Sequence, residues 1–483
     1  MRNSRQLRPS QKSNRELPLP LTPRLATMLN GTDQSLYDVE AVLFTLVLVG
    51  LLLGWLSARL RRSRPAFSIG FALTTSVTVR LLAVGAVSVV APTIRGGDES
   101  IWLQEARDLS QLPSLSKWID AFTASFGRQP GPNSGNHPGS LHTWLFAIEM
   151  RIGHFPELAM RIVQVGISVA GLVLLAAAVY DLAGPRAARL ASWILALEPT
   201  NVFFSGFLHK EPLMLFASGL TVLGAVRIWQ RRDRTGVVLL VMGCVVAVGT
   251  RPYAGYFLIG GAVALCLHAA LTRRGQAHRR SLQMASILVL LVLVATPTVL
   301  SQTSDQQIRA RLAVSQQANA ASAANLNLET VQYSNRADVV LNLPLRIADV
   351  VLQPYPWQLG STSQRLGIGG SMIAYAVLFL ILRLIFLARW ALLRRAGPIV
   401  YPAVFLLLAY SVSAANAGTS FRLRTTVVTL AICVILVMRE PASAPLRRWH
   451  DSTRRSPDEF HRAPQPAGTA PVAVALWSGD GQR

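Results

Sequence analysis

Apolar segments long enough to cross a membrane alternate with short polar connections along most of the chain. Runs such as 42–56, 282–300 and 371–387 approach the roughly 20 apolar residues that a bilayer-spanning helix needs. The pattern predicts an all-α, polytopic membrane protein with about 10–11 transmembrane helices. The expected segments lie at about 40–58, 66–92, 159–181, 187–205, 211–229, 236–250, 253–272, 282–300, 371–389, 398–415 and 423–438.

Arginine clusters mark the alternate connections between these segments. Lys and Arg prefer the cytoplasmic side, so these connections are expected inside and the loops of about 93–158 and 301–370 outside. The same alternation places the C-terminus in the cytoplasm. The clusters are Arg59 to Arg64, Arg186 and Arg189, Arg231 to Arg234, Arg273 to Arg280, and Arg389 to Arg395.

Composition agrees with a membrane location. Hydrophobic residues make up 51% of the 483 residues and charged residues only 15%, whereas a soluble domain carries about a quarter charged residues. The net charge of +23 falls mostly in the predicted inside loops and the tails, where membrane orientation explains it, so no nucleic-acid partner is expected. The three cysteines lie in apolar segments and are interpreted as core residues. The excess of Arg and Ala favours a bacterial plasma-membrane protein.

The chain divides into a polar, basic N-terminal tail (1–39), a transmembrane region (40–438) and a disordered cytoplasmic tail (439–483). The stretch 138–153 is too short to span and contains Glu149 and Arg151, so it is interpreted as an interfacial or re-entrant helix. The orientation of the N-terminus stays open. Alternation places this basic tail outside, unless the first apolar segment is a peripheral hairpin arm.

The stretch from Gly96 to Arg107, which contains Asp98 and Glu99, resembles the first external loop of the GT-C polytopic glycosyltransferases. That group includes the protein O-mannosyltransferases and lipid A aminoarabinose transferases of glycosyltransferase family 39. The stretches 137–144 and 197–213 are similar to later parts of the same pattern, so the resemblance covers roughly residues 90–260. It implies transfer of a sugar from a polyprenyl-phosphate carrier to an external acceptor, with Asp98 as the catalytic carboxylate.

The residues themselves favour the same chemistry. A carboxylate is needed to take the proton of the acceptor hydroxyl, and cations are needed to hold the departing phosphate. Asp98 is the candidate base, and Glu99 orients the acceptor or Asp98. Glu211 is expected to pair with its neighbour Lys210 or to position the acceptor. The candidate substrate-binding residues on the predicted outer side are His209, Lys210, Glu211, Arg251, Tyr253, Trp357, Arg422 and Arg424.

Each of these residues also has a simpler interpretation. Asp98 and Glu99 are suited to capping a helix, and Lys210 to snorkelling at the membrane boundary. External arginines contact lipid headgroups, and Trp357 fits an interfacial aromatic belt. No cofactor is assigned, and a divalent metal on Asp98, Glu99 and Glu211 is left open. The acceptor is a glycan, a lipid or a protein.

Two other functions compete with a GT-C transferase. An O-antigen polymerase- or ligase-like enzyme also has many helices, a large external loop and external arginines, but it relies on Arg and His rather than on an early Asp-Glu pair. A transporter or flippase is disfavoured because the sequence has no inverted repeat and its ionisable residues lie at one face. The acidic pair in the first external loop therefore favours the GT-C transferase.

Overall fold

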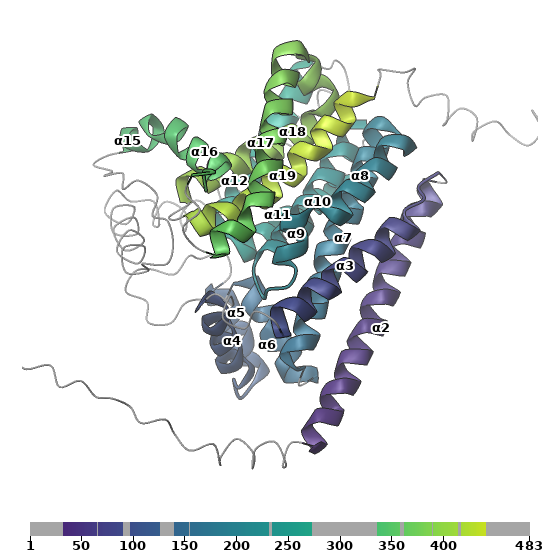
Figure 1. Ribbon diagram of the computed structural model, residues 1–483, viewed down its shortest axis with the longest axis vertical. Coiled ribbons are helices and arrows are strands. Elements are labelled where there is room, and N and C mark those ends of the chain that lie inside the picture. Colours follow the sequence, from purple (N-terminus) through teal and green to yellow (C-terminus); the bar gives the residue numbers. More distant parts are fainter. Residues whose placement is uncertain are drawn as a thin grey trace, which may run out of the picture.

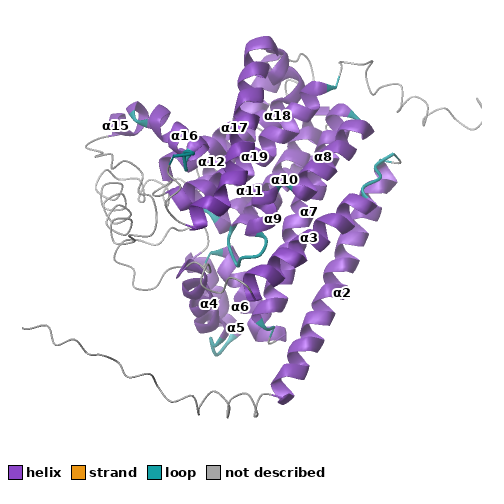
Figure 2. Cartoon of the chain, viewed as in Figure 1, coloured by secondary structure: helices purple, strands orange, loops and turns teal. Residues whose placement is uncertain are grey.

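The structure, a computed structural model, describes residues 32–64, 66–89, 97–125, 140–153, 155–230, 234–272, 336–357, 362–388, 390–413 and 417–440. Over these ranges it consists of helices and short connections without strands (Figure 1 and Figure 2). Eight of the described helices are long and apolar enough to cross a membrane. The predicted all-α, polytopic membrane fold is therefore confirmed.

Some sequence predictions fall outside the described residues. They are the expected segment 282–300, the cluster Arg273 to Arg280, much of the loop 301–370 and most of both tails. The first helix of the described residues, α2 (Thr32–Ser63), begins earlier than the predicted start near residue 40. It packs against α7 (Glu157–Ala183) along one side of the molecule and leaves most of its apolar surface exposed (Figure 1).

The centre of the molecule is a set of four helices that pack in sequence. Helix α7 contacts α10, which contacts α11, which in turn contacts α12. Helices α7 and α10 approach closely because glycines face each other, and a Cβ on Gly219 would lie 2.7 Å from the carbonyl oxygen of Gly171. The four helices are α7 (Glu157–Ala183), α10 (Glu211–Gln230), α11 (Arg234–Thr250) and α12 (Pro252–Thr272).

The C-terminal helices pack onto this centre. Helix α18 contacts α12 and α19, and the short α16 lies against both α18 and α19. Helix α3 lies on the other side, against α7 and α8 (Pro185–Leu197). These elements are α3 (Gly70–Val89), α15 (Arg336–Leu341), α16 (Leu343–Leu352), α17 (Thr362–Ala388), α18 (Trp390–Ser413) and α19 (Ala417–Arg439).

The segment expected over about 187–205 is two helices rather than one, so that prediction is wrong. Helix α8 (Pro185–Leu197) ends at Glu198, and α9 (Pro199–Phe204) follows. The Glu198 carboxylate caps α9, because Oε1 accepts a hydrogen bond from the backbone N–H of Thr200 (3.1 Å) and Oε2 from that of Asn201 (2.6 Å). Proline at the first position of α9 suits a helix start.

The other side of this break is stabilised by Arg80 of α3. Its guanidinium donates to the carbonyl oxygens of Ala196 (2.8 Å) and Leu195 (3.3 Å) at the end of α8. Backbone groups freed inside a membrane bundle must find partners within the protein. Arg80 and Glu198 together supply those partners.

Helices α4, α5 and α6 gather at one end of the bundle (Figure 1). The residues of α6 that face α4 belong to a small core of Ala106, Phe146, Ala147, Met160 and Leu208. Helix α6 is too short to span a bilayer, in agreement with the interpretation of 138–153 as a non-spanning helix. The three helices are α4 (Gly97–Ser110), α5 (Leu115–Ser125) and α6 (Leu141–Gly153).

The described arginine clusters lie at the opposite end of the bundle, which we name the arginine-rich end. It contains the α2–α3 and α7–α8 connections and the starts of α11 and α18 (Figure 1). Arg64 is buried there and forms an ion pair with Asp181, with a distance of 2.9 Å between Nε and Oδ1. The separation of the two ends agrees with the predicted alternation of loops. Their assignment to the two sides of the membrane stays a prediction.

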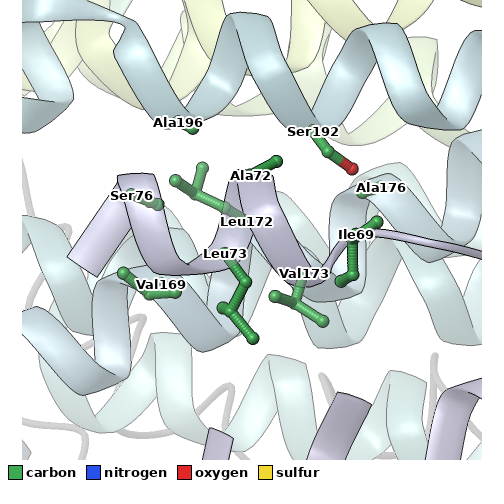
Figure 3. A pocket seen from close by; sticks show the side chains of 10 residues that line it. All are labelled: Ile69, Ala72, Leu73, Ser76, Val169, Leu172, Val173, Ala176, Ser192 and Ala196. Carbon is green, nitrogen blue, oxygen red and sulfur yellow. The ribbon is translucent and has the colours of Figure 1, made fainter. Parts of the chain in front are cut away.

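An apolar pocket lies between α3, α7 and α8 (Figure 3). No charged side chain is among the residues that line it, so it offers no cation to a phosphate. Its lining consists of alkyl side chains and two serines, namely Ile69, Ala72, Leu73, Ser76, Val169, Leu172, Val173, Ala176, Ser192 and Ala196.

Candidate functional site

Glu99 fastens the first turn of α4 to the rest of the molecule. Its side chain is 3% exposed. Oε2 pairs with Nη2 of Arg161 in α7 (2.8 Å), and Oε1 accepts a hydrogen bond from the backbone N–H of Leu208 (2.7 Å). Leu208 directly precedes His209, Lys210 and Glu211, which we name the 209–211 segment. One carboxylate therefore holds the start of α4 against this segment.

Asp98 is the second residue of α4, and its side chain lies outside the described part of the chain. Trp102 lies one helical turn later on the same face of α4. The Trp102 ring contacts the ring of His209, with 5.4 Å between centroids, and the Nζ of Lys210 lies 5.2 Å from the Trp102 ring centroid. The face of α4 that carries Trp102 is therefore turned toward the 209–211 segment.

Glu211 and Arg251 form the second buried ion pair of the site. The distance between Glu211 Oε1 and Arg251 Nη2 is 2.7 Å, and both side chains are largely buried. The pairing differs from the expected partner, because Glu211 bonds to an arginine from the α11–α12 connection rather than to Lys210. The rings of Tyr253 and Tyr410 lie beside this pair, 6.5 Å apart and nearly perpendicular.

The two arginines of α19 differ in their surroundings. Arg422 is partly exposed and interacts electrostatically with Glu211. Arg424 is 2% exposed, and its Nη1 donates to the carbonyl oxygens of Gln353 (2.6 Å) and Val351 (3.1 Å). Its Nη2 donates to Oγ of Ser371 (2.6 Å). Arg424 thus holds the end of α16 against α17 and α19, and Arg422 is the member of the pair near the Glu211 carboxylate.

The predicted aromatic loop forms a stacked pair. The rings of Tyr355 and Trp357 are nearly parallel, with centroids 4.9 Å apart, and Trp357 is 78% exposed. The Oη of Tyr375 donates to the carbonyl oxygens of Leu352 (2.6 Å) and Pro354 (3.1 Å), which fixes the backbone of this loop. No described contact joins Trp357 to the 209–211 segment, so its part in the site stays a prediction.

Sequence reasoning missed two buried residues. Arg161 interrupts the apolar run of α7, and its partner Glu157 lies one turn earlier, a spacing that the sequence displays. His142 of α6 lies within the stretch 137–144 that carries the family resemblance. Its ring centroid is 5.2 Å from that of Trp102, and it interacts electrostatically with Lys210. Only the folding of α4 and α6 onto the 209–211 segment shows that His142 belongs to the site.

The described residues bring no three metal-binding side chains together. Of the carboxylates considered for a metal, Glu99 pairs with Arg161 and Glu211 pairs with Arg251. An arginine therefore lies against each of these two carboxylates. The described residues instead present a site rich in cations and aromatic rings.

The fold is that of a multi-pass membrane protein. Charged and aromatic side chains gather in one site at one end of its helix bundle. Residues 136–300 match the family described as dolichyl-phosphate-mannose-protein mannosyltransferase. The match confirms the resemblance to GT-C glycosyltransferases and supports a membrane glycosyltransferase that uses a polyprenyl-phosphate-linked donor. It contains His142, the 209–211 segment and Arg251, whereas Asp98 and Arg422 lie outside it. Comparisons with curated proteins and with solved structures give no match.

Proposed function

We propose that the chain transfers a sugar from a polyprenyl-phosphate-linked donor to an acceptor on the external face of the membrane, with Asp98 as general base. The observation that carries the proposal is the double contact of Glu99 with Arg161 and with the backbone of Leu208. We take this contact as support for a position of Asp98 close to the 209–211 segment. The family match over residues 136–300 supports the donor class.

The chemistry is a single displacement at the anomeric carbon of the sugar. The acceptor hydroxyl oxygen attacks this carbon while the Asp98 carboxylate takes the hydroxyl proton. The bond between the anomeric carbon and the phosphate oxygen breaks, and its electron pair leaves with the polyprenyl phosphate. Asp98 then releases the proton to water. Attack opposite the leaving group inverts the anomeric configuration.

Lys210 and Arg422 are the cations best suited to the departing phosphate. Both are partly exposed, and both lie near the Glu211–Arg251 pair. A guanidinium binds phosphate through two parallel hydrogen bonds, and an ammonium adds a compact charge. Arg251 adds positive charge near the phosphate while one of its nitrogens stays bonded to Glu211. Preorganised cations of this kind stabilise charge that develops in the transition state.

Arg161 has a different part. Its guanidinium donates to Glu99, to Glu157 and to the carbonyl oxygen of Gly206, so its hydrogen-bonding capacity is used inside the protein. The polymerase- or ligase-like alternative relies on external arginines. The described contacts weigh against it for Arg424, which bonds to Gln353 and Ser371 inside the protein.

The test is transfer of radiolabelled polyprenyl-phosphate sugars in membranes. Asp98→Asn is compared with the wild type and with Asp120→Asn, which changes an exposed carboxylate of α5. We expect Asp98→Asn to lose at least about 100-fold in transfer rate, as removal of a general base does. Asp120→Asn should transfer at the wild-type rate. Wild-type transfer by Asp98→Asn would remove the base role, and absence of transfer by the wild type from any such donor would contradict the proposed function.

A further inference from the structure

His142 has hydrogen-bonding groups without a partner among the described residues. The ring is fully buried, yet neither Nδ1 nor Nε2 bonds to any of those residues. Buried polar atoms are nearly always paired, and an unpaired one destabilises the protein. These two ring nitrogens lie inside the candidate site, where His142 interacts electrostatically with Lys210, Glu211 and Arg251.

The surroundings of His142 keep its ring neutral. Burial is the largest influence, followed by the electrostatic influence of Lys210 and of His209, and together they hold the pKa of His142 well below its usual range. Glu211 opposes this shift and Arg251 adds to it. A neutral imidazole offers one donor and one acceptor. This pair matches a hydroxyl group, which also donates and accepts, whereas an ionised phosphate only accepts.

The neighbour of His142 is an aromatic ring suited to a carbohydrate. Trp102 contacts His142 in an edge-to-face arrangement at 5.2 Å and is itself partly exposed. Indole rings combine a large apolar face with a polar edge, and ligand pockets typically join such rings to a few polar groups. Trp102 lies one turn after Asp98 on α4, so a sugar at this ring lies beside the proposed base.

We propose that Trp102 and His142 form the subsite for the sugar of the lipid-linked donor. The sugar ring lies against the indole of Trp102, and one of its hydroxyls exchanges hydrogen bonds with His142. This inference rests on the proposed function and names the part of the site that distinguishes one sugar from another. Because His142 is fully buried, the sugar reaches it when the partly exposed Trp102 side chain shifts.

The test compares two ligands that differ only in the sugar. Binding of polyprenyl-phosphate mannose and of sugar-free polyprenyl phosphate is measured on the purified full chain. His142→Phe keeps a ring and removes both nitrogens, whereas His142→Gln keeps a donor and an acceptor. The control is His268→Phe in α12, because His268 likewise contacts aromatic rings. We expect only His142→Phe to lose affinity for the mannose lipid, by about 10-fold, with sugar-free binding unchanged.

Equal loss for both lipids, or no loss for either, would overturn the subsite. If His142→Phe fails to fold, the wild type is titrated with mannose lipids that each lack one hydroxyl. At least one of them should then bind about 10-fold more weakly, and equal binding of all would also overturn the subsite. A wild type that binds neither lipid contradicts the proposed function as well. If the wild type binds both lipids and His142→Phe leaves its preference for the mannose lipid unchanged, the result contradicts the subsite alone.

Discussion

Glu99 and Glu157 both pair with Arg161, but their exposure differs. The Glu99 side chain is buried, whereas that of Glu157 is 38% exposed. Breaking a buried ion pair costs about 3–5 kcal/mol, and Glu157 still partners Arg161 when Glu99 is changed, so we expect Glu99→Gln to lower the free energy of unfolding by about 3 kcal/mol. Glu157→Gln should cost less than about 1 kcal/mol. Thermal unfolding in detergent measures both effects.

Transfer kinetics separate positioning from stability in the same two variants. Glu99→Gln keeps an oxygen for the N–H of Leu208 but loses the charge that attracts Arg161, so the start of α4 loosens. We expect kcat to fall at least about 10-fold with little change in KM, because a small displacement of a catalytic group is costly. Equal kcat values for Glu99→Gln and Glu157→Gln would show that Glu99 does not position the base.

Arg422 and Arg424 are separated by one residue, but we expect substitutions at the two positions to have different effects. Arg424→Gln leaves the carbonyl oxygens of Val351 and Gln353 short of a donor, so we expect a lower unfolding temperature. Arg422→Gln should raise KM for the lipid-linked donor about 10-fold, through loss of a phosphate contact. Unfolding and kinetic measurements on both variants check this. A normal KM in a folded Arg422→Gln protein would remove Arg422 from the phosphate site.

Glu149 makes the stability of the protein depend on pH. It is buried in α6, and neither of its carboxylate oxygens bonds to a described residue. Burial raises the pKa of Glu149 from its usual 4.5 to about 8. Between these values the folded state holds a proton that the unfolded state has released, so Glu149 lowers stability progressively as the pH rises through this range.

Glu149→Gln should remove this pH dependence. We expect the variant to unfold at a higher temperature than the wild type near pH 8, and at a similar temperature near pH 5. Thermal unfolding at the two pH values provides the measurement, with Asp120→Asn on the exposed face of α5 as the control. A difference between Glu149→Gln and wild type that is the same at both pH values would contradict the role of this carboxyl.

At the scale of single residues, the sequence was a better guide to where charges gather than to which charges pair. Alternation of the segments predicted that Glu99, the 209–211 segment and Arg251 lie at one end, and they do. The partner of Glu211 was missed because adjacent residues at a helix start point in different directions. Its carboxylate meets an arginine that is far away in sequence. Such pairs depend on how α10, α11 and α12 pack, which hydropathy does not encode.

At the scale of helices, the contact between α7 and α10 positions both ion pairs of the site, since α7 carries Arg161 and α10 begins with Glu211. We expect Gly219→Ala to destabilise the protein by about 1–3 kcal/mol, because its Cβ would lie 2.7 Å from a backbone oxygen of α7. The matched control is Gly85→Ala in α3, where no atom lies within 4 Å of the new Cβ. Unfolding temperatures should fall for Gly219→Ala only. An equal effect at both positions would show that the close approach is unimportant.

The helix break at Glu198 shows what a hydropathy pattern overlooks. The run 187–205 is apolar enough to suggest one segment, but an acidic residue followed by proline is also the signature of a new helix start. The local sequence therefore indicated a helix start at Glu198, but the high mean hydropathy of the run 187–205 suggested a single helix. The partner that makes the break tolerable, Arg80, comes from α3, and only the tertiary structure brings it to the end of α8.

At the scale of the whole molecule, the orientation in the membrane decides which donors the site meets. The positive-inside pattern predicts that α4–α6 face the exterior and the arginine-rich end faces the cytoplasm. Cysteines introduced at Lys117 in α5 and at Arg62 at the end of α2 test this, since both positions are exposed and the native cysteines are buried. A membrane-impermeant maleimide should label Lys117→Cys in intact cells, and Arg62→Cys only after permeabilisation. The reverse pattern would put the site on the cytoplasmic side, where soluble nucleotide sugars are available as donors, and it would contradict the external acceptor of the proposed function.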